Sequence, residues 1–347
     1  MKKTKKLLAL LLALLLTGSL LTACGGSEDE VQEDAQDQTT EDTQSGDSTE
    51  TDWPTKPIQM IVPFDAGGDT DFNARQYAKY LEEELGQPVA VSNVVGNSGM
   101  LAAKEVYDAD ADGYTILFTH SSINVNTAAG TSDIGIEDFE MVRVCGRPAV
   151  EAIAVRSDSP YETLDDLVAA IKENPGDFIV PASIGATSHY ACLLMEKACG
   201  VELNIVNSGA SSDRTAGLKG GNFEFIINPY GTMKSFIDSG DFRILATVGE
   251  ERSSQFPDIP TAKELGYEDL VSVNAYYILV PKGTPEAIIE KLGAAIDDIS
   301  NNNEEYATAI AEAYYQDTFL LNREDSVAYA QDELARFMEM SAELKGE

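Results

Sequence analysis

The sequence predicts an α/β protein of two domains, each with a mostly parallel sheet flanked by helices. A chain of 347 residues that is 43% hydrophobic is long enough to bury two substantial cores. From Trp53 onward, short apolar runs rich in β-branched residues alternate with segments of helical periodicity. The order strand, Gly/Ser/Thr-rich turn and helix recurs in both halves. This pattern predicts two helix starts that face one another across a cleft.

The first strand, turn and helix surround the stretch PFDAGGDTDFNAR at residues 63–75. The apolar run 58–62 before it predicts a buried strand. After it, apolar and aromatic positions fall on one helix face, and Gly86 is placed as the stop signal. The two glycines of the turn let backbone amides approach a ligand, and the helix start attracts anions. Alternatively, the glycines only make a tight turn in which Thr70 or Asp71 caps the helix.

The other elements follow in chain order. In the first domain we expect strands at 89–92 and 114–119, and a helix that is opened by 96–99 and runs through 107. In the second domain we expect helices at 164–171, at 189–198 and from 213, and strands at 178–183, 204–207, 223–228 and 243–248.

The chain is expected to pass from the first domain to the second at 146–148, which separates the apolar stretches 134–145 and 150–155. It is expected to return to the first domain at 271–280. Helices at 285–300 and 325–344 complete the first domain. Domain 1 is therefore expected at 53–147 plus 267–347, and domain 2 at 148–266.

Residues 1–23 have the features of a lipoprotein signal peptide. Four lysines precede an apolar core at 7–23, and a Leu-Thr-Ala-Cys box ends at Cys24. We expect cleavage to leave Cys24 as a lipidated N-terminus. An uncleaved anchor helix is disfavoured, because about 17 apolar residues are fewer than the ~20 that a span needs. Residues 25–52 contain eleven acidic residues and no Lys or Arg. We therefore expect residues 24–52 to be a lipidated cysteine followed by a disordered acidic linker.

The charge balance excludes two classes of partner. The formal net charge is -35, and removal of residues 1–23 takes away four lysines and no acids, which leaves -39. A chain this acidic does not bind nucleic acid or an anionic membrane surface by charge attraction. We expect no nucleic-acid partner.

The sequence carries no signature of metal or nucleophilic chemistry. Two histidines and no Cys-x-x-Cys pair leave no zinc constellation, and we expect no cofactor. The segment Gly-Asn-Ser-Gly-Met at 96–100 lacks the last glycine of the G-x-S-x-G serine motif. Only His120 and His189 are available as an imidazole base. We therefore predict that the protein is not an enzyme.

Three cysteines remain after Cys24. Cys192 and Cys199 share a predicted helix, where seven residues advance ~10.5 Å, beyond the ~7 Å limit for a disulfide. This favours buried free thiols. A disulfide between Cys145 and one of the other two stays open at this point.

Several separated motifs agree in order with one known family. They are Trp-Pro-Thr-Lys-Pro-Ile at 53–58, PFDAGG at 63–68 with Asp71 and Ala74-Arg75, Leu-Gly-Gln-Pro-Val at 85–89, Asp-Gly-Tyr-Thr at 112–115, Pro-Asp-Ile-Pro-Thr at 257–261 and Pro-Lys-Gly-Thr-Pro at 281–285. The chain beyond Trp53 resembles the solute-binding proteins of tripartite tricarboxylate transporters, also called the Bug family. The resemblance implies a two-domain fold of the periplasmic-binding-protein type II (Venus flytrap) class.

The strand ends and turns, together with the resemblance, point to a set of ligand-binding residues. The expected residues are Phe64, Ala66, Gly67, Gly68, Thr70, Asp71, Ser121, Ser183, Gly185, Ala186, Thr187, His189, Ser208, Gly209 and Asn228. The resemblance implies that the first loop holds a carboxylate group by backbone amides and ordered water. A side chain at Gly67 is therefore expected to fill this cradle. His189 is either a donor to the ligand or a structural capping residue.

The sequence also departs from the family pattern near the expected site. Asp65 stands where the family usually has a small residue or proline, and Asp69 lies next to the double glycine. The segments at 97–99 and 206–209 differ from the usual turns as well. Extra carboxylates weaken an anion site, so a trivalent acid is disfavoured. A monocarboxylate, a dicarboxylate and a partly cationic ligand stay open.

These inferences combine into one expected function. The chain is expected to be a monomeric bacterial receptor, lipid-anchored on the outside of the cell membrane, in either envelope type. Its domains close on a small carboxylate by a hinge motion and deliver it to membrane permease subunits of the tripartite type. Two alternatives from other classes are a ligand-sensing ectodomain that feeds a signalling partner and a carboxylate-processing enzyme.

Overall fold

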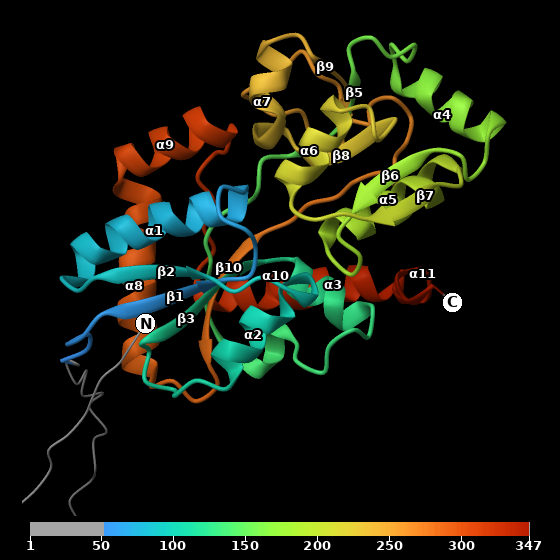
Figure 1. Cartoon of the computed structure of the whole chain (residues 1–347). Coiled ribbons are helices and arrows are strands. Elements are labelled where there is room, and N and C mark those ends of the chain that lie inside the picture. The colour runs from blue at the N-terminus through green and yellow to red at the C-terminus, as the bar shows by residue number, and fades with distance from the viewer. Residues whose placement is uncertain (1–51, 347) are drawn as a thin grey trace, which may run out of the picture. The chain divides into compact units, whose positions relative to one another are not determined.

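The computed structural model describes residues 52–346, and a five-stranded sheet organises their N-terminal part (Figure 1). The strand order is β2 (Val89–Asn93), β1 (Ile58–Val62), β3 (Thr115–His120), β10 (Tyr276–Pro281) and β4 (Phe139–Val144). Strand β1 pairs in parallel with β2 and β3. Strand β10 is antiparallel to both β3 and β4.

Helices cover both faces of this sheet. They are α1 (Asp69–Leu85), α2 (Met100–Tyr107), α3 (Ser122–Ala128), α8 (Glu286–Asn302), α9 (Glu304–Tyr314) and α10 (Arg323–Met338). Met60 of β1 packs in one core with α1 and α8, and the next residue, Ile61, packs in another with α2 and α10. Because both faces are buried, β1 is a continuous apolar run in the sequence.

The second part of the fold contains a three-stranded sheet and a strand pair. The sheet has the order β8 (Phe225–Pro229), β5 (Glu151–Arg156) and β9 (Phe242–Thr247), and the pair is β6 (Ile179–Ala182) with β7 (Asn204–Asn207). Its helices are α4 (Leu164–Glu173), α5 (Thr187–Cys199), α6 (Ser211–Lys219) and α7 (Tyr230–Asp238). The chain enters this part between β4 and β5 and leaves it between β9 and β10 (Figure 1).

The predicted α/β class is confirmed, but the prediction of mostly parallel sheets needs a correction. Parallel pairing is found among β1, β2 and β3 and between β6 and β7. Strand β5 is antiparallel to β8 and β9, as β10 is to its own neighbours. Both β5 and β10 follow a crossing rather than a helical βαβ connection, so nothing forces them to run parallel.

Most predicted elements lie within a few residues of the observed ones, and Gly86 ends α1 in the left-handed conformation (φ 68°). Three helices were not predicted, namely α3, α7 and α9. Helix α6 begins at Ser211, two residues before the expected start. The long helix expected at 325–344 is divided into α10 and α11 (Ser341–Lys345). Two short 3-10 helices, Asn97–Gly99 and Ile136–Asp138, complete the fold.

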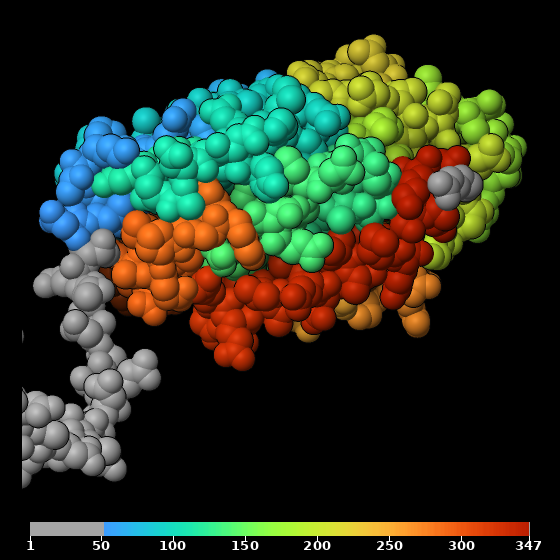
Figure 2. Space-filling model, turned by 90° about the horizontal axis from the view of Figure 1, so that it is seen from below, coloured from blue at the N-terminus to red at the C-terminus, as the bar shows by residue number. Residues whose placement is uncertain are grey.

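The C-terminal helices reach the second part of the fold. Phe337, Met340 and Leu344 belong to one buried cluster with residues of α5, β6 and β8. Figure 2 shows the C-terminal segment, in red, running along this face of the molecule. The domain boundaries expected near 148 and 266 stay a prediction.

Cys145, Cys192 and Cys199 are buried and free, which confirms the prediction of free thiols and leaves no disulfide with Cys145. The predicted leader, the lipidation site Cys24 and nearly all of the acidic linker lie outside the described residues. Between residues 52 and 346, no helix has the length and apolar character needed to cross a membrane.

Candidate functional site

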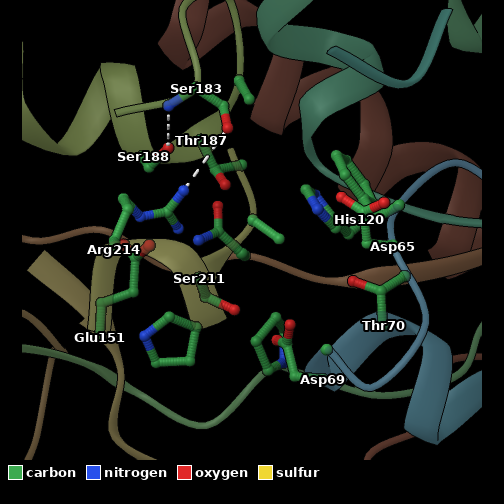
Figure 3. Close-up of a pocket in the computed structure, with 17 residues that line it drawn as sticks. Asp65, Asp69, Thr70, His120, Glu151, Ser183, Thr187, Ser188, Ser211 and Arg214 are labelled. Atoms are coloured by element: carbon green, nitrogen blue, oxygen red, sulfur yellow. Dashed lines mark hydrogen bonds between the residues drawn. The ribbon is translucent and has the colours of Figure 1, made fainter. Parts of the chain in front are cut away.

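A cavity of about 60 Å³ lies between the two parts of the fold (Figure 3). Its walls are the turn between β1 and α1, the end of β3, the turns before α5 and α6, and the crossing segments. The lining residues are Phe64, Asp65, Gly68, Asp69, Thr70, His120, Pro148, Glu151, Ser183, Ala186, Thr187, Ser188, Ala210, Ser211, Arg214, Pro229 and Asn274. Elements that are far apart in sequence therefore meet at one small space.

Three helices begin at this cavity. Gly68, Ala186 and Ala210 precede α1, α5 and α6, and none of these three residues caps its helix through a side chain. The N–H groups of a first helical turn have no partner inside the helix, and the helix dipole adds positive potential there. The three helix starts thus favour an anionic group, although Asp69 and Asp213 lie in the first turns of α1 and α6.

Arg214 of α6 supplies the positive charge of the cavity, and its side chain points from α6 towards Ser183 in Figure 3. Only 6% of the residue is exposed. Its Nε donates to Asn228 Oδ1 at 2.8 Å and its Nη1 to the Gly209 carbonyl at 2.8 Å. Within residues 52–346, Nη2 has no hydrogen-bond partner and no carboxylate lies within 4 Å of the guanidinium. Burial lowers the pKa of Arg214, but a guanidinium stays protonated at neutral pH.

Asn228 holds Arg214 in place from the end of β8. The residue is fully buried, and its Nδ2 donates to the Ser211 carbonyl at 2.8 Å and to Thr215 Oγ1 at 3.0 Å. With its amide nitrogen held in this way, Asn228 presents its Oδ1 to Arg214 and accepts the hydrogen bond from Nε. Asn228 was predicted as a ligand residue, but it does not line the cavity and acts on it through Arg214.

Two poorly solvated carboxylates share the cavity with Arg214. Glu151 is 4% exposed and accepts a hydrogen bond from Ser272 Oγ at 3.0 Å. Burial raises the pKa of Glu151 to about 7, against the opposing effects of Ser272 and Arg214. Asp69 accepts a hydrogen bond from the Tyr276 hydroxyl at 2.9 Å, and burial raises its pKa as well.

His120 lies at the end of β3 as a neutral group. Its ring stacks on Phe64 with centroids 4.4 Å apart, and its Nδ1 accepts a hydrogen bond from the Ser122 N–H at 3.1 Å. Burial lowers the pKa of His120 to about 3, and Arg214 adds to this effect. The neutral ring therefore carries its proton on Nε2, as a hydrogen-bond donor.

Asn274 lies in the crossing segment before β10. It is 8% exposed, and its Oδ1 is buried without a hydrogen-bond partner in the described structure. A buried polar atom without a partner costs free energy, so this acceptor marks a place for a donor that is not part of the chain.

Six of the expected ligand residues line the cavity. They are Phe64, Gly68, Thr70, Ser183, Ala186 and Thr187. The turns before α1 and α5 were thus predicted at the level of whole segments.

In the first loop, Ala66, Gly67 and Asp71 do not line the cavity. The Gly67 N–H donates to Asp71 Oδ2 at 2.9 Å and is therefore not available to a ligand. A Cβ atom at Gly67 would meet nothing within 4 Å, and the expectation that a side chain there blocks a ligand stays a prediction.

The other expected residues of the turns and strand ends also lie away from the cavity. Ser121 is fully buried, and its hydroxyl donates to Glu333 of α10. The Gly185 N–H donates to His189 Nδ1 at 3.3 Å, which agrees with the structural alternative for this histidine. Ser208 and Gly209 line an adjoining hollow that shares Phe64, Asp65, Ser183 and Ala210 with the cavity. The Gly209 carbonyl accepts a hydrogen bond from Arg214 Nη1.

Arg214, Glu151, Ser211 and Asn274 were missed by the sequence analysis. Glu151 left a visible signal, since it is a charged residue inside the apolar run 150–155. Arg214 left none, because the polar stretch that contains it is typical of an exposed helix start.

Asp71 holds the first loop together, and its removal is expected to destabilise the protein. Arg75 Nε, the Gly67 N–H and Asn93 Nδ2 donate to its carboxylate at 2.9–3.0 Å. Burial opposes ionisation, but these hydrogen bonds lower the pKa of Asp71. We expect Asp71→Ala to lower the free energy of unfolding at pH 7 by about 3 kcal/mol in urea titrations.

The matched control for this variant is Asp108→Ala. Asp108 pairs with Lys104 at the same helical spacing, but both side chains are more than half exposed. Exposed pairs contribute ~0.5 kcal/mol or less. Equal losses in the two variants would contradict the role given to Asp71.

Comparisons with known proteins cover both parts of the fold. Residues 73–345 match the family model described as "Tripartite tricarboxylate transporter family receptor". The chain is 32% identical over 269 residues to the protein BugT of Bordetella pertussis, which covers 76% of this chain and 80% of BugT. It is 30% identical over 275 residues to the UPF0065 protein in the gbd 5' region of Cupriavidus necator, with 77% and 82% covered. Among solved structures, R. palustris Rpa4515 with adipate is similar at a TM-score of 0.79 and 26% identity, over 85% of this chain and 99% of that one.

Proposed function

The chain belongs to the tripartite tricarboxylate transporter family of receptors, and from this we propose that it captures a small carboxylate between its two domains and delivers it to a membrane permease. As a member of this family it is a solute receptor and not an enzyme. Rpa4515 was solved with adipate, a dicarboxylate, and this supports a carboxylate as the class of ligand.

One observation carries the carboxylate proposal. Arg214 is a buried cation whose Nη2 has no partner in the described structure, at a cavity where three helices begin. Leaving a donor of a buried charged group without a hydrogen-bond partner is costly, whereas a carboxylate pairs with a guanidinium through strong charge-assisted hydrogen bonds. A bound carboxylate is therefore the natural partner of Arg214.

A thermal-shift screen of the purified protein tests this proposal. Mono- and dicarboxylates at ~100 times their dissociation constant should add ~2.7 kcal/mol, which shifts the midpoint by about 5 °C in a protein of this size. The matched neutral amides should give no shift. Shifts with the amides alone would contradict a carboxylate ligand.

We also propose that binding closes the two domains like a hinged trap. Gly231 at the start of α7 lies against Tyr314 at the end of α9, and a Cβ atom at Gly231 would be 2.6 Å from Tyr314 Cα. Gly231→Val would therefore separate α7 from α9. We expect about tenfold weaker ligand binding by calorimetry, since overpacking costs 1–3 kcal/mol.

Ser235→Val, on an exposed position of the same helix, is the control and should bind normally. A radius of gyration from X-ray scattering that is larger for the Gly231 variant with ligand would agree with incomplete closure. Unchanged affinity in that variant would contradict closure at this contact.

The lipid anchor and the permease complete the proposed function. Cys24→Ala should move the protein from the membrane fraction to the supernatant, because no lipid can then be attached. Crosslinking of the wild type in intact cells should capture permease subunits. Capture of a sensor kinase instead would favour the sensing alternative.

A further inference from the structure

The cavity contains more acid than base. Arg214 is its only cationic side chain within residues 52–346, whereas Asp65, Asp69 and Glu151 all line it. His120 is neutral, as shown above. A ligand that is only anionic would pair with Arg214 but would also approach these carboxylates, which repel it.

We propose that the ligand is a zwitterionic amino acid, whose carboxylate binds Arg214 and whose protonated amine binds Glu151, Asp69 and Asn274. This inference deepens the proposed function and rests on it, because it keeps the same cavity and the same carboxylate end. It adds a second charged group of opposite sign to the ligand.

The carboxylate end is defined by donors. Arg214 Nη2 is the unpartnered donor, and Ser211 begins α6 close to it in the sequence. In Figure 3, Arg214, Ser211 and Ser183 lie on the same side of the cavity. A carboxylate placed there meets a guanidinium and the first turn of α6 together.

The amine end is defined by acceptors. Glu151 uses Oε2 to accept from Ser272, and its Oε1 has no partner in the described structure. Asn274 Oδ1 is a buried acceptor, also without a partner. An ammonium group has three donors and no acceptor, so it satisfies acceptors of this kind and compensates the carboxylates at the same time.

The placement of the two charges favours the same class of ligand. Figure 3 shows Glu151 beside Arg214, and each of the two residues shifts the pKa of the other. The groups that would take the amine and the carboxylate therefore lie close together. An α-amino acid has this arrangement.

Calorimetric titration with matched pairs of compounds tests the inference. The probes are L-alanine with propionate, L-aspartate with succinate and L-glutamate with glutarate, each pair differing by one amino group, and ethylamine as an amine without a carboxylate. We expect at least one amino acid to bind tenfold or more tightly than its partner without the amine. Equal or tighter binding of the partner acids would overturn the inference and leave the proposed function intact, whereas binding of ethylamine alone would overturn both.

Two variants locate the amine site. Glu151→Gln keeps the size of the side chain and its acceptor for Ser272. It should reduce the preference for the amino acid about tenfold, because the ammonium loses a charged partner and the partner acid loses a carboxylate that repels it. Asp69→Asn should reduce the preference in the same direction and serves if the first variant does not fold. Glu250→Gln, which removes a surface carboxylate paired with Lys263, is the control and should keep the full preference. An undiminished preference in both cavity variants would overturn the assignment.

Discussion

Replacing Arg214 by methionine is expected to weaken ligand binding by about 100-fold or more. Methionine keeps much of the volume and removes the charge and all donors. Hydrogen bonds between charged partners contribute up to ~3 kcal/mol, and a loss of that size is about a 100-fold change in dissociation constant. The measurement is calorimetric titration with the best ligand from the thermal-shift screen.

The free protein should lose much less than the complex in this variant. Asn228 Oδ1 and the Gly209 carbonyl lose their donor, which is unfavourable, but the cost of burying a cation whose Nη2 has no partner disappears as well. Arg214→Lys should give intermediate affinity, because an ammonium keeps the charge without the planar fork.

A second arginine with backbone partners provides the control. Arg243 donates to the carbonyls of Ser157, Ser159 and Tyr161 and lies outside the cavity. Arg243→Met should therefore lower stability and leave affinity unchanged. Equal losses of affinity in the Arg214 and Arg243 variants would show that Arg214 has only a structural role.

The strand, turn and helix around residues 58–86 could be predicted because their signals are local. An apolar run, a glycine pair, one apolar helix face and a terminating glycine determine β1, the turn and α1 without help from the rest of the chain. The same reasoning located the turns before α5 and α6. Each of these predictions used only residues that are neighbours in sequence.

The chemistry of the cavity depends on contacts that are distant in sequence. Ser121 follows a strand as predicted, but a residue 212 positions later, Glu333, takes its hydroxyl. Arg214 is buried only because Asn228 and the Gly209 carbonyl receive its donors. The end of a strand in the sequence predicts a residue at the edge of the sheet, but it does not predict which way that side chain points. The positions of the turns could therefore be predicted from the sequence, whereas the charged side chains that line the cavity could not.

Glu151 is expected to make the ligand-free protein less stable at high pH. Burial raises the pKa of Glu151 from 4.5 to about 7, so the folded state binds a proton more tightly than the unfolded state. The resulting stabilisation is complete below pH 4.5 and is lost as the pH rises through about 7. A shift of this size corresponds to about 3 kcal/mol between these limits.

Glu151→Gln should remove this dependence. Glutamine resembles the protonated acid and keeps an acceptor for Ser272, so the variant should match the wild type near pH 4.5 and exceed it by about 3 kcal/mol at pH 8.5. Urea unfolding of both proteins at the two pH values measures the difference. Glu250→Gln at the surface should change little at either pH. A Glu151 variant that is less stable than the wild type at pH 8.5 would mean that Glu151 is ionised and compensated without a ligand, and the place for an amine would be lost with it.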